Sequence, residues 1–191
     1  MKRVPPALVA LRALCGPVLL AAAAAAEPAW FLAALVSVAF VSDVFDGIIA
    51  RRLGVATAKL RRADTIADTA FYLCAGVALF LLAPSVIEAH LAGVAGILAL
   101  EAVRWAVERA RYGRLAAYHM WSAKAWGVTL WLGFSEAFLT GRPGLFIQAA
   151  VVMGLVADAE GLLASLILST WHHDIRTLWD AMRIEKEAGK S

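Results

Sequence analysis

The chain has 191 residues, of which 62% are hydrophobic and 17% charged, and its formal net charge is +3. The mean hydropathy of +0.73 is far above that of a soluble globular domain, which excludes a water-soluble enzyme of ordinary composition. The composition predicts an integral membrane protein, and we expect no nucleic-acid partner.

Six apolar segments follow one another, each near or above the roughly 20 residues that cross a bilayer as a helix. They cover residues 4–26, 28–50, 63–83, 84–107, 115–140 and 143–171. We expect the first not to be a signal peptide, because Arg12 interrupts it and it exceeds the usual h-region of about 7–15 residues. The pattern predicts an all-α integral membrane protein: one domain over residues 1–171 that forms a bundle of six transmembrane helices.

Residues 172–191 form a charged tail. Ile175, Leu178, Trp179 and Met182 recur at helical spacing, which predicts a short amphipathic helix against the membrane surface. A solvated charged tail is the alternative.

The basic residues indicate the orientation. With six spans, seventeen of the 18 Lys and Arg fall at or near the side that carries both termini, and Arg142 falls opposite. The positive-inside rule makes the side of the termini cytoplasmic.

Four aspartates lie where the second predicted span ends and the third begins. Asp43 and Asp46 are three residues apart, and Asp64 and Asp68 are four apart, so each pair shares one helix face. A short basic loop, with five Lys and Arg between the pairs, brings the two helix ends together. Gly47 keeps side-chain bulk low beside the first pair.

Four carboxylates at the membrane edge repel one another unless cations neutralise them. The nearby arginines alone would give a salt-bridged turn without a ligand. The functional interpretation is a Mg²⁺ or Mn²⁺ site, because these ions take carboxylate oxygens and bridge to phosphates. Two ions about 4 Å apart suit displacement at phosphorus. The cluster contains no His or Cys, which argues against zinc.

The stretch "DVFDGIIAR" followed by "DTIAD" resembles the signature of the CDP-alcohol phosphotransferase family, D-x2-D-G-x2-A-R, a spacer, then G-x3-D-x3-D. Leu60 stands where the signature has its second glycine, which puts the path of the loop in question. Upstream, Pro5, Arg12 and Pro17 match half of a pattern found in family enzymes that make phosphatidylglycerol phosphate. The signature positions that agree, seven of eight, are Asp43, Asp46, Gly47, Ala50, Arg51, Asp64 and Asp68.

The resemblance implies transfer of a phosphatidyl group from CDP-diacylglycerol to an alcohol, with release of CMP, in phospholipid synthesis. It implies that Asp43, Asp46, Asp64 and Asp68 hold one or two Mg²⁺ or Mn²⁺ ions and that Asp68 is also the general base. The implied nucleotide or phosphate site comprises Asp43, Gly47, Ala50 and Arg51.

The resemblance further implies a homodimer in a bacterial inner membrane, with the site facing the cytoplasm. Small residues in "AGVAGILAL", residues 92–100, would allow close helix packing either between two chains or within one.

The acceptor alcohol is less well defined. Arg104, Arg109 and Lys124 lie near the next cytoplasmic helix ends, where the positive-inside rule alone would place cations. We hypothesise that they form an anion pocket for a phosphorylated acceptor, with glycerol 3-phosphate ahead of an inositol phosphate. Inositol, serine and phosphatidylglycerol, the last as in a cardiolipin synthase, are alternative acceptors. A further alternative is the chemistry of CDP-choline and CDP-ethanolamine enzymes, in which the alcohol rather than the lipid carries the nucleotide.

A divalent-cation transporter is the alternative from another class, because intramembrane carboxylates also mark ion pathways. The aspartates cluster at one face of the membrane, and no inverted repeat is visible, which argues against it. A purely structural subunit gives no reason for the Gly-x-x-Ala-Arg spacing. Asp158 and Glu160 lie within the sixth apolar segment; either they pair with a cation from another helix, or the segment boundary is wrong.

Overall fold

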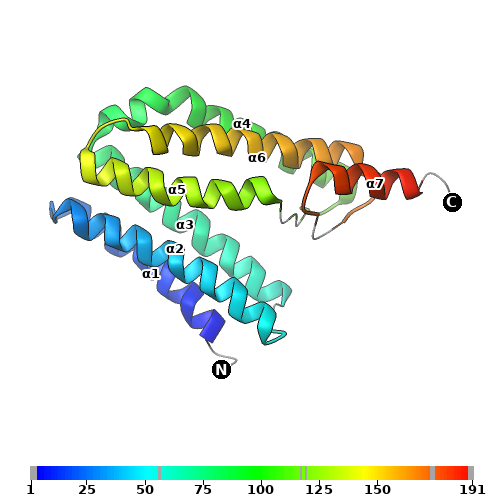
Figure 1. Ribbon diagram of the computed structural model, residues 1–191, viewed down its shortest axis with the longest axis horizontal. Coiled ribbons are helices and arrows are strands. Elements are labelled where there is room, and N and C mark those ends of the chain that lie inside the picture. The colour runs from blue at the N-terminus through cyan, green and yellow to red at the C-terminus, as the bar shows by residue number, and fades with distance from the viewer. Residues whose placement is uncertain (1–3, 56, 117, 119, 173–174, 189–191) are drawn as a thin grey trace. The chain divides into compact units, whose positions relative to one another are not determined.

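The computed structural model describes residues 4–188 except 56, 117, 119 and 173–174, and gives only the backbone of residues 58, 59, 61 and 62. Three basic side chains of the loop between the aspartate pairs, those of Lys59, Arg61 and Arg62, therefore lie outside the described part. Within that part helices are the only regular secondary structure, which confirms the predicted all-α class (Figure 1). The helices are α1 (Val4–Ala24), α2 (Ala29–Arg52), α3 (Ala58–Leu82), α4 (Pro84–Tyr112), α5 (Trp121–Thr140), α6 (Leu145–Ile167) and α7 (Leu178–Ala188).

Five helices of the described residues are long and apolar enough to cross a membrane: α1, α2, α3 from Ala63 onward, α4 and α6. Helix α5 has 20 residues but is not among them, because Lys124, Glu136, two serines and three tryptophans lower its hydropathy. The six-span bundle and the cytoplasmic side of the termini therefore stay predictions. The predicted break near Pro84 is confirmed, since α3 ends at Leu82 and proline is tolerated in the first turn of α4.

The chain forms two compact units. Unit 1 comprises Met1–Ala89 and Trp131–Ile147, and unit 2 comprises His90–Leu130 and Gln148–Ser191. The boundary of a membrane domain at residue 171 stays a prediction.

In unit 1, α1 packs against both α2 and α3 (Figure 1). Leu19 of α1, Val36 of α2 and Leu79 of α3 are fully buried in this three-helix contact. Gly16 allows the closest approach, because a Cβ added there would lie 3.3 Å from the Cα of Phe71. The register of α1 against α3 is therefore tightly constrained.

The C-terminal half of α5 completes unit 1. The indole N–H of Trp131 donates a hydrogen bond of 3.0 Å to the Ser37 hydroxyl, and its ring stacks on Phe40 with the centroids 4.8 Å apart. At the other end of α5, Glu136 accepts a 2.8 Å hydrogen bond from the backbone N–H of Phe146 at the start of α6. These polar contacts fix α5 to α2 and to the first turn of α6.

In unit 2, α4 packs closely on α6. A Cβ added at Gly93 would overlap the side chain of Val151, and one added at Gly96 would lie 3.1 Å from Leu155. Gly93 and Gly96 therefore serve packing within the chain, which was one of the two possibilities left by the sequence.

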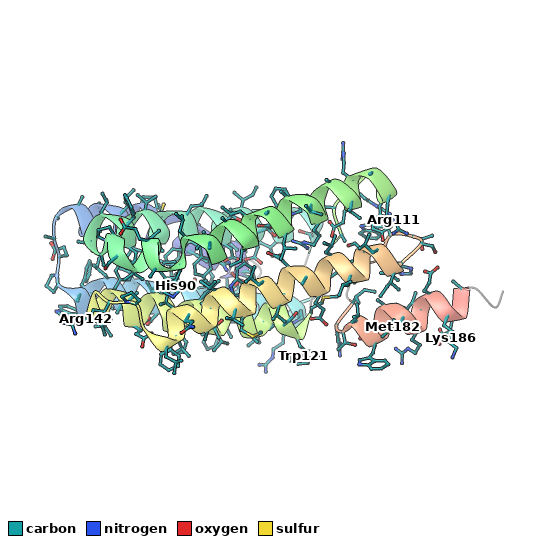
Figure 2. All side chains as sticks on the ribbon, turned by 90° about the horizontal axis from the view of Figure 1, so that it is seen from above. His90, Arg111, Trp121, Arg142, Met182 and Lys186 are labelled. Atoms are coloured by element: carbon teal, nitrogen blue, oxygen red, sulfur yellow. The ribbon has the colours of Figure 1, made fainter. Side chains whose placement is uncertain are left out.

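Unit 2 also contains the tail helix. Arg111 of α4 donates to the carbonyl oxygens of Leu166 and Leu168, at 2.7 and 3.1 Å, and so caps the end of α6 (Figure 2). A helix is present in the tail as α7, but it begins at Leu178, so Ile175 precedes it and packs with Ala181 and Leu168 in a buried core. Trp179 of α7 is 78% exposed, and the location of this helix on a membrane surface stays a prediction.

The close approach at Gly16 generates a stability prediction. We expect Gly16→Leu to destabilise the protein by about 1–3 kcal/mol, because the added side chain must displace the backbone of α3. Thermal unfolding of the purified protein in detergent measures this. Gly76→Leu is the matched control, since a Cβ at Gly76 meets nothing within 4 Å. Equal melting temperatures for the two variants would contradict the packing described here.

Candidate active site

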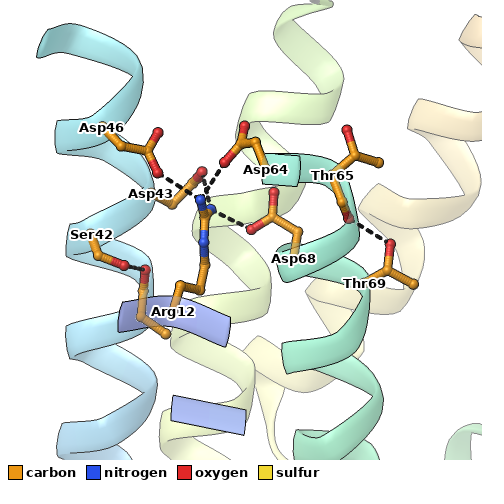
Figure 3. Close-up of polar contacts among 9 residues, drawn as sticks. Arg12, Ser42, Asp43, Asp46, Asp64, Thr65, Asp68 and Thr69 are labelled. Atoms are coloured by element: carbon orange, nitrogen blue, oxygen red, sulfur yellow. Dashed lines mark hydrogen bonds and ion pairs between the residues drawn. The ribbon is translucent and has the colours of Figure 1, made fainter. Parts of the chain in front are cut away.

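The structure brings the four aspartates together. Asp43 and Asp46 project from the last turns of α2, and Asp64 and Asp68 from the first turns of α3 (Figure 3). One carboxylate oxygen each from Asp43, Asp64 and Asp68 lie within 4.8 Å of one another. The site therefore presents oxygen ligands from both helices in a space of metal-binding size.

A short connection places the two helix ends side by side. Helix α2 ends at Arg52, and Gly54 adopts a left-handed conformation with φ of +63°, which glycine accommodates without strain. Thr57 caps α3 and accepts a 3.2 Å hydrogen bond from the N–H of Leu60. Leu60 thus lies in the first helical turn, where the backbone does not require the glycine of the family signature.

Arg12 of α1 occupies the centre of the aspartate cluster (Figure 3). Its Nη1 donates to Asp43 and Asp68, and its Nη2 donates to Asp64 and, at 2.6 Å, to Asp46. The side chain is 1% exposed. One guanidinium group therefore links α1, α2 and α3 through four ion pairs.

The sequence did not predict this role of Arg12. It identified Arg12 as a cation at the cytoplasmic side and as part of a half-matched upstream pattern. The sequence did show that Arg12 is a charged side chain within an apolar span, and such a side chain needs a partner or a ligand. It also showed that the four aspartates need a counterion. Only the packing of α1 against α2 and α3 shows that Arg12 is that counterion.

The remaining signature residues shape one side of the cluster. A Cβ added at Gly47 would lie 3.3 Å from Nη1 of Arg51, so the guanidinium of Arg51 folds back over the glycine one turn earlier. Ala50 is buried, and Arg51 is exposed. Gly47 and Ala50 therefore leave room for the exposed guanidinium of Arg51 beside the carboxylates. A cation in this position can bind an anionic group such as a phosphate.

The charge of the cluster favours a divalent cation. Four ionised carboxylates against one guanidinium leave a formal charge of −3, and the Asp46 side chain is only 6% exposed. Such an excess is unfavourable where solvation is poor. The all-oxygen ligand set is the one that Mg²⁺ and Mn²⁺ prefer, and the Arg12 guanidinium shows that positive charge is accommodated between the carboxylates. The residues present therefore fit a divalent ion.

The three cations predicted to bind the acceptor have different local partners in unit 2. Arg104 lies 3.6 Å from Glu101 and 3.8 Å from both Glu108 and Asp158. Arg109 donates a 2.8 Å hydrogen bond to the carbonyl oxygen of Gly113, just beyond the end of α4. The Nζ of Lys124 lies 4.1 Å from the centroid of the Trp121 ring, which is a cation–π contact.

Asp158 and Glu160 also have partners. Asp158 of α6 pairs with Arg104 of α4, so the pairing with a cation from another helix is confirmed for this residue. Glu160 accepts a 3.2 Å hydrogen bond from the N–H of Leu178 at the start of α7. Both acidic residues thus join elements within unit 2.

Comparison with known proteins identifies the family. No curated protein and no solved structure matched the chain. The family model for CDP-alcohol phosphatidyltransferase matches residues 2–178, which include all four aspartates and Arg12. This is a family of membrane phosphotransferases in phospholipid synthesis that transfer a phosphatidyl group from a CDP-alcohol, and its members generally depend on a divalent metal. The match spans nearly the whole sequence, so the chain belongs to the CDP-alcohol phosphatidyltransferase family.

Proposed function

We propose that the protein transfers the phosphatidyl group of CDP-diacylglycerol to the hydroxyl of an alcohol and releases CMP. The observation that carries the proposal is the convergence of Asp43, Asp46, Asp64 and Asp68 around a single cationic group. Membership of a transferase family favours this function over divalent-cation transport by the same carboxylates.

In this proposal the four aspartates hold one or two Mg²⁺ or Mn²⁺ ions. When bound, a divalent ion neutralises the pyrophosphate charge that grows as the bond to CMP breaks. Gly47 and Ala50 leave space for the nucleotide or a phosphate, and the exposed Arg51 pairs with its negative charge.

Asp68 is proposed to accept the proton of the attacking hydroxyl. Its side chain is partly exposed, so an alcohol can approach the carboxylate from outside the cluster. The hydroxyl oxygen forms the new bond to the lipid-side phosphorus, the bond to CMP breaks, and the proton passes to Asp68.

The apolar helices and the family support an integral membrane protein. We propose an integral protein of a bacterial inner membrane, with the aspartates facing the cytoplasm, as the distribution of basic residues predicts. A homodimer is proposed from the family resemblance alone, because Gly93 and Gly96 are already used in packing within the chain.

For the acceptor we propose glycerol 3-phosphate, with an inositol phosphate as the next candidate, bound by Arg104, Arg109 and Lys124. Arg104 shares its charge with three carboxylates, so Arg109 and Lys124 would provide most of the attraction for a phosphate. The alternative acceptors are inositol, which is uncharged, serine, which is a zwitterion, and phosphatidylglycerol, which is a lipid. In the remaining alternative, CDP-choline or CDP-ethanolamine is the nucleotide substrate and the lipid is the acceptor.

The role of Asp68 is tested by CMP release. We expect Asp68→Asn to lower turnover at least 100-fold, because general-base catalysis typically contributes about 10²–10⁴-fold, while CDP-diacylglycerol still binds. The assay uses purified protein in detergent with Mg²⁺ or Mn²⁺. Asp180→Asn in α7 is the matched control with normal turnover. Equal loss of lipid binding and turnover would make Asp68 a metal ligand only, and normal turnover would remove it from the mechanism.

The acceptor is tested by offering glycerol 3-phosphate, inositol phosphate, inositol, serine and phosphatidylglycerol one at a time. We expect release of CMP with a phosphorylated acceptor. Arg109→Gln and Lys124→Gln should each raise the KM for that acceptor several-fold without changing the KM for CDP-diacylglycerol, because each removes one charge from the pocket. An unchanged acceptor KM in both variants would exclude this pocket.

A further inference from the structure

Arg12 occupies the atoms that the proposed function assigns to metal ions. Each of its two terminal nitrogens bridges the two helices, Nη1 from Asp43 to Asp68 and Nη2 from Asp46 to Asp64. Every aspartate in the cluster therefore uses at least one carboxylate oxygen to accept a hydrogen bond from the same guanidinium group.

Coordination of a divalent ion conflicts with this arrangement. A divalent ion is bound through the lone pairs of carboxylate oxygens. The oxygens of Asp43, Asp64 and Asp68 that lie within 4.8 Å of one another leave room for one such ion. Arg12 is buried with 1% exposure, so its charge is poorly screened from an ion placed among the same oxygens. Two such cations would repel one another strongly at this distance.

We propose that Arg12 is an internal counterion that competes with the metal. It neutralises and holds the aspartates together in the metal-free protein, and its guanidinium withdraws when a divalent ion is coordinated. The inference rests on the proposed function only in taking the four aspartates as the metal ligands.

The polar contacts of Arg12 are concentrated on the aspartates, whereas α1 is held by separate contacts. Its Nε is buried without a hydrogen-bond partner among the described residues, so the polar contacts of the guanidinium are those to the four aspartates. The backbone of α1 is held one turn later by the close contact of Gly16 with Phe71. Because α1 is held at Gly16, we expect withdrawal of Arg12 to involve its side chain rather than the helix.

A permanent structural salt bridge makes the opposite prediction. If the aspartates bound metal with Arg12 still in place, its removal would disorder the ligands and weaken metal binding. If Arg12 competes, its removal changes the formal charge of the cluster from −3 to −4, frees all the oxygens and strengthens metal binding. The sign of the change in metal affinity separates the two roles without an activity assay.

The experiment measures Mn²⁺ affinity, by electron paramagnetic resonance of the free ion, in purified protein in detergent. We expect Arg12→Gln to bind Mn²⁺ at least tenfold more tightly than the wild type, a change in Kd equivalent to about 1.4 kcal/mol. Arg12→Lys should be intermediate, because an ammonium keeps the charge but lacks the planar fork that reaches four carboxylates. Arg142→Gln removes an exposed cation of unit 1 and is the matched control with wild-type affinity.

Thermal unfolding provides the second readout. Without metal, Arg12→Gln should melt at a lower temperature than the wild type, because four carboxylates lose their counterion. Saturating Mn²⁺ should raise its melting temperature more than that of the wild type, as tighter binding to the folded state requires.

The outcomes are distinct. Wild-type Mn²⁺ binding with equal or weaker binding by Arg12→Gln would overturn the competition and leave the proposed function standing. Absence of Mn²⁺ binding by every protein would overturn both. If Arg12→Gln does not fold, Arg12→Lys decides: tighter binding than the wild type supports competition, and equal or weaker binding overturns it.

Discussion

The ion pairs between Arg12 and the four aspartates link α1, α2 and α3 of unit 1 in the metal-free protein, and they place the four carboxylates around one point. Asp43 and Asp46 on one helix end repel Asp64 and Asp68 on the next, and removing one partner of a buried ion pair typically costs about 3–5 kcal/mol. The contact of Gly16 with α3 sets the position of α1, and the short turn at Gly54 sets the position of the two aspartate pairs. Both local features are needed for one guanidinium to reach all four carboxylates.

Both units contain an arginine surrounded by carboxylates within apolar helices, but access differs between them. In unit 1, the side chain of Asp43 is 44% exposed, and those of Asp64 and Asp68 are also partly exposed, so a ligand can reach them. In unit 2, Asp158 and Glu108 around Arg104 are almost fully buried, and Glu108 accepts hydrogen bonds from the Ser165 hydroxyl and the N–H of Ala116. Glu101, the third carboxylate beside Arg104, is as exposed as Asp64, so the difference in access between the clusters comes from Asp158 and Glu108.

Much of this organisation could be predicted from the sequence because it is local. Hydropathy gave the helices to within several residues, and the spacing of three and four placed each aspartate pair on one face. Arg12 could not be assigned to the cluster, since it lies 31 to 56 residues from its partners and the register between helices depends on packing. The same limit applies to Arg104, which was predicted to bind an acceptor and whose pairing with Asp158 depends on which faces of α4 and α6 meet.

The most direct test of the account is a crystal structure of the protein grown with Mn²⁺, in which anomalous scattering locates the ion. The account predicts an anomalous peak bound by oxygens of Asp43, Asp64 and Asp68, with the Arg12 guanidinium moved away from the carboxylates. A structure with Mn²⁺ in the solution, no peak in the cluster and Arg12 still paired with all four aspartates would contradict it.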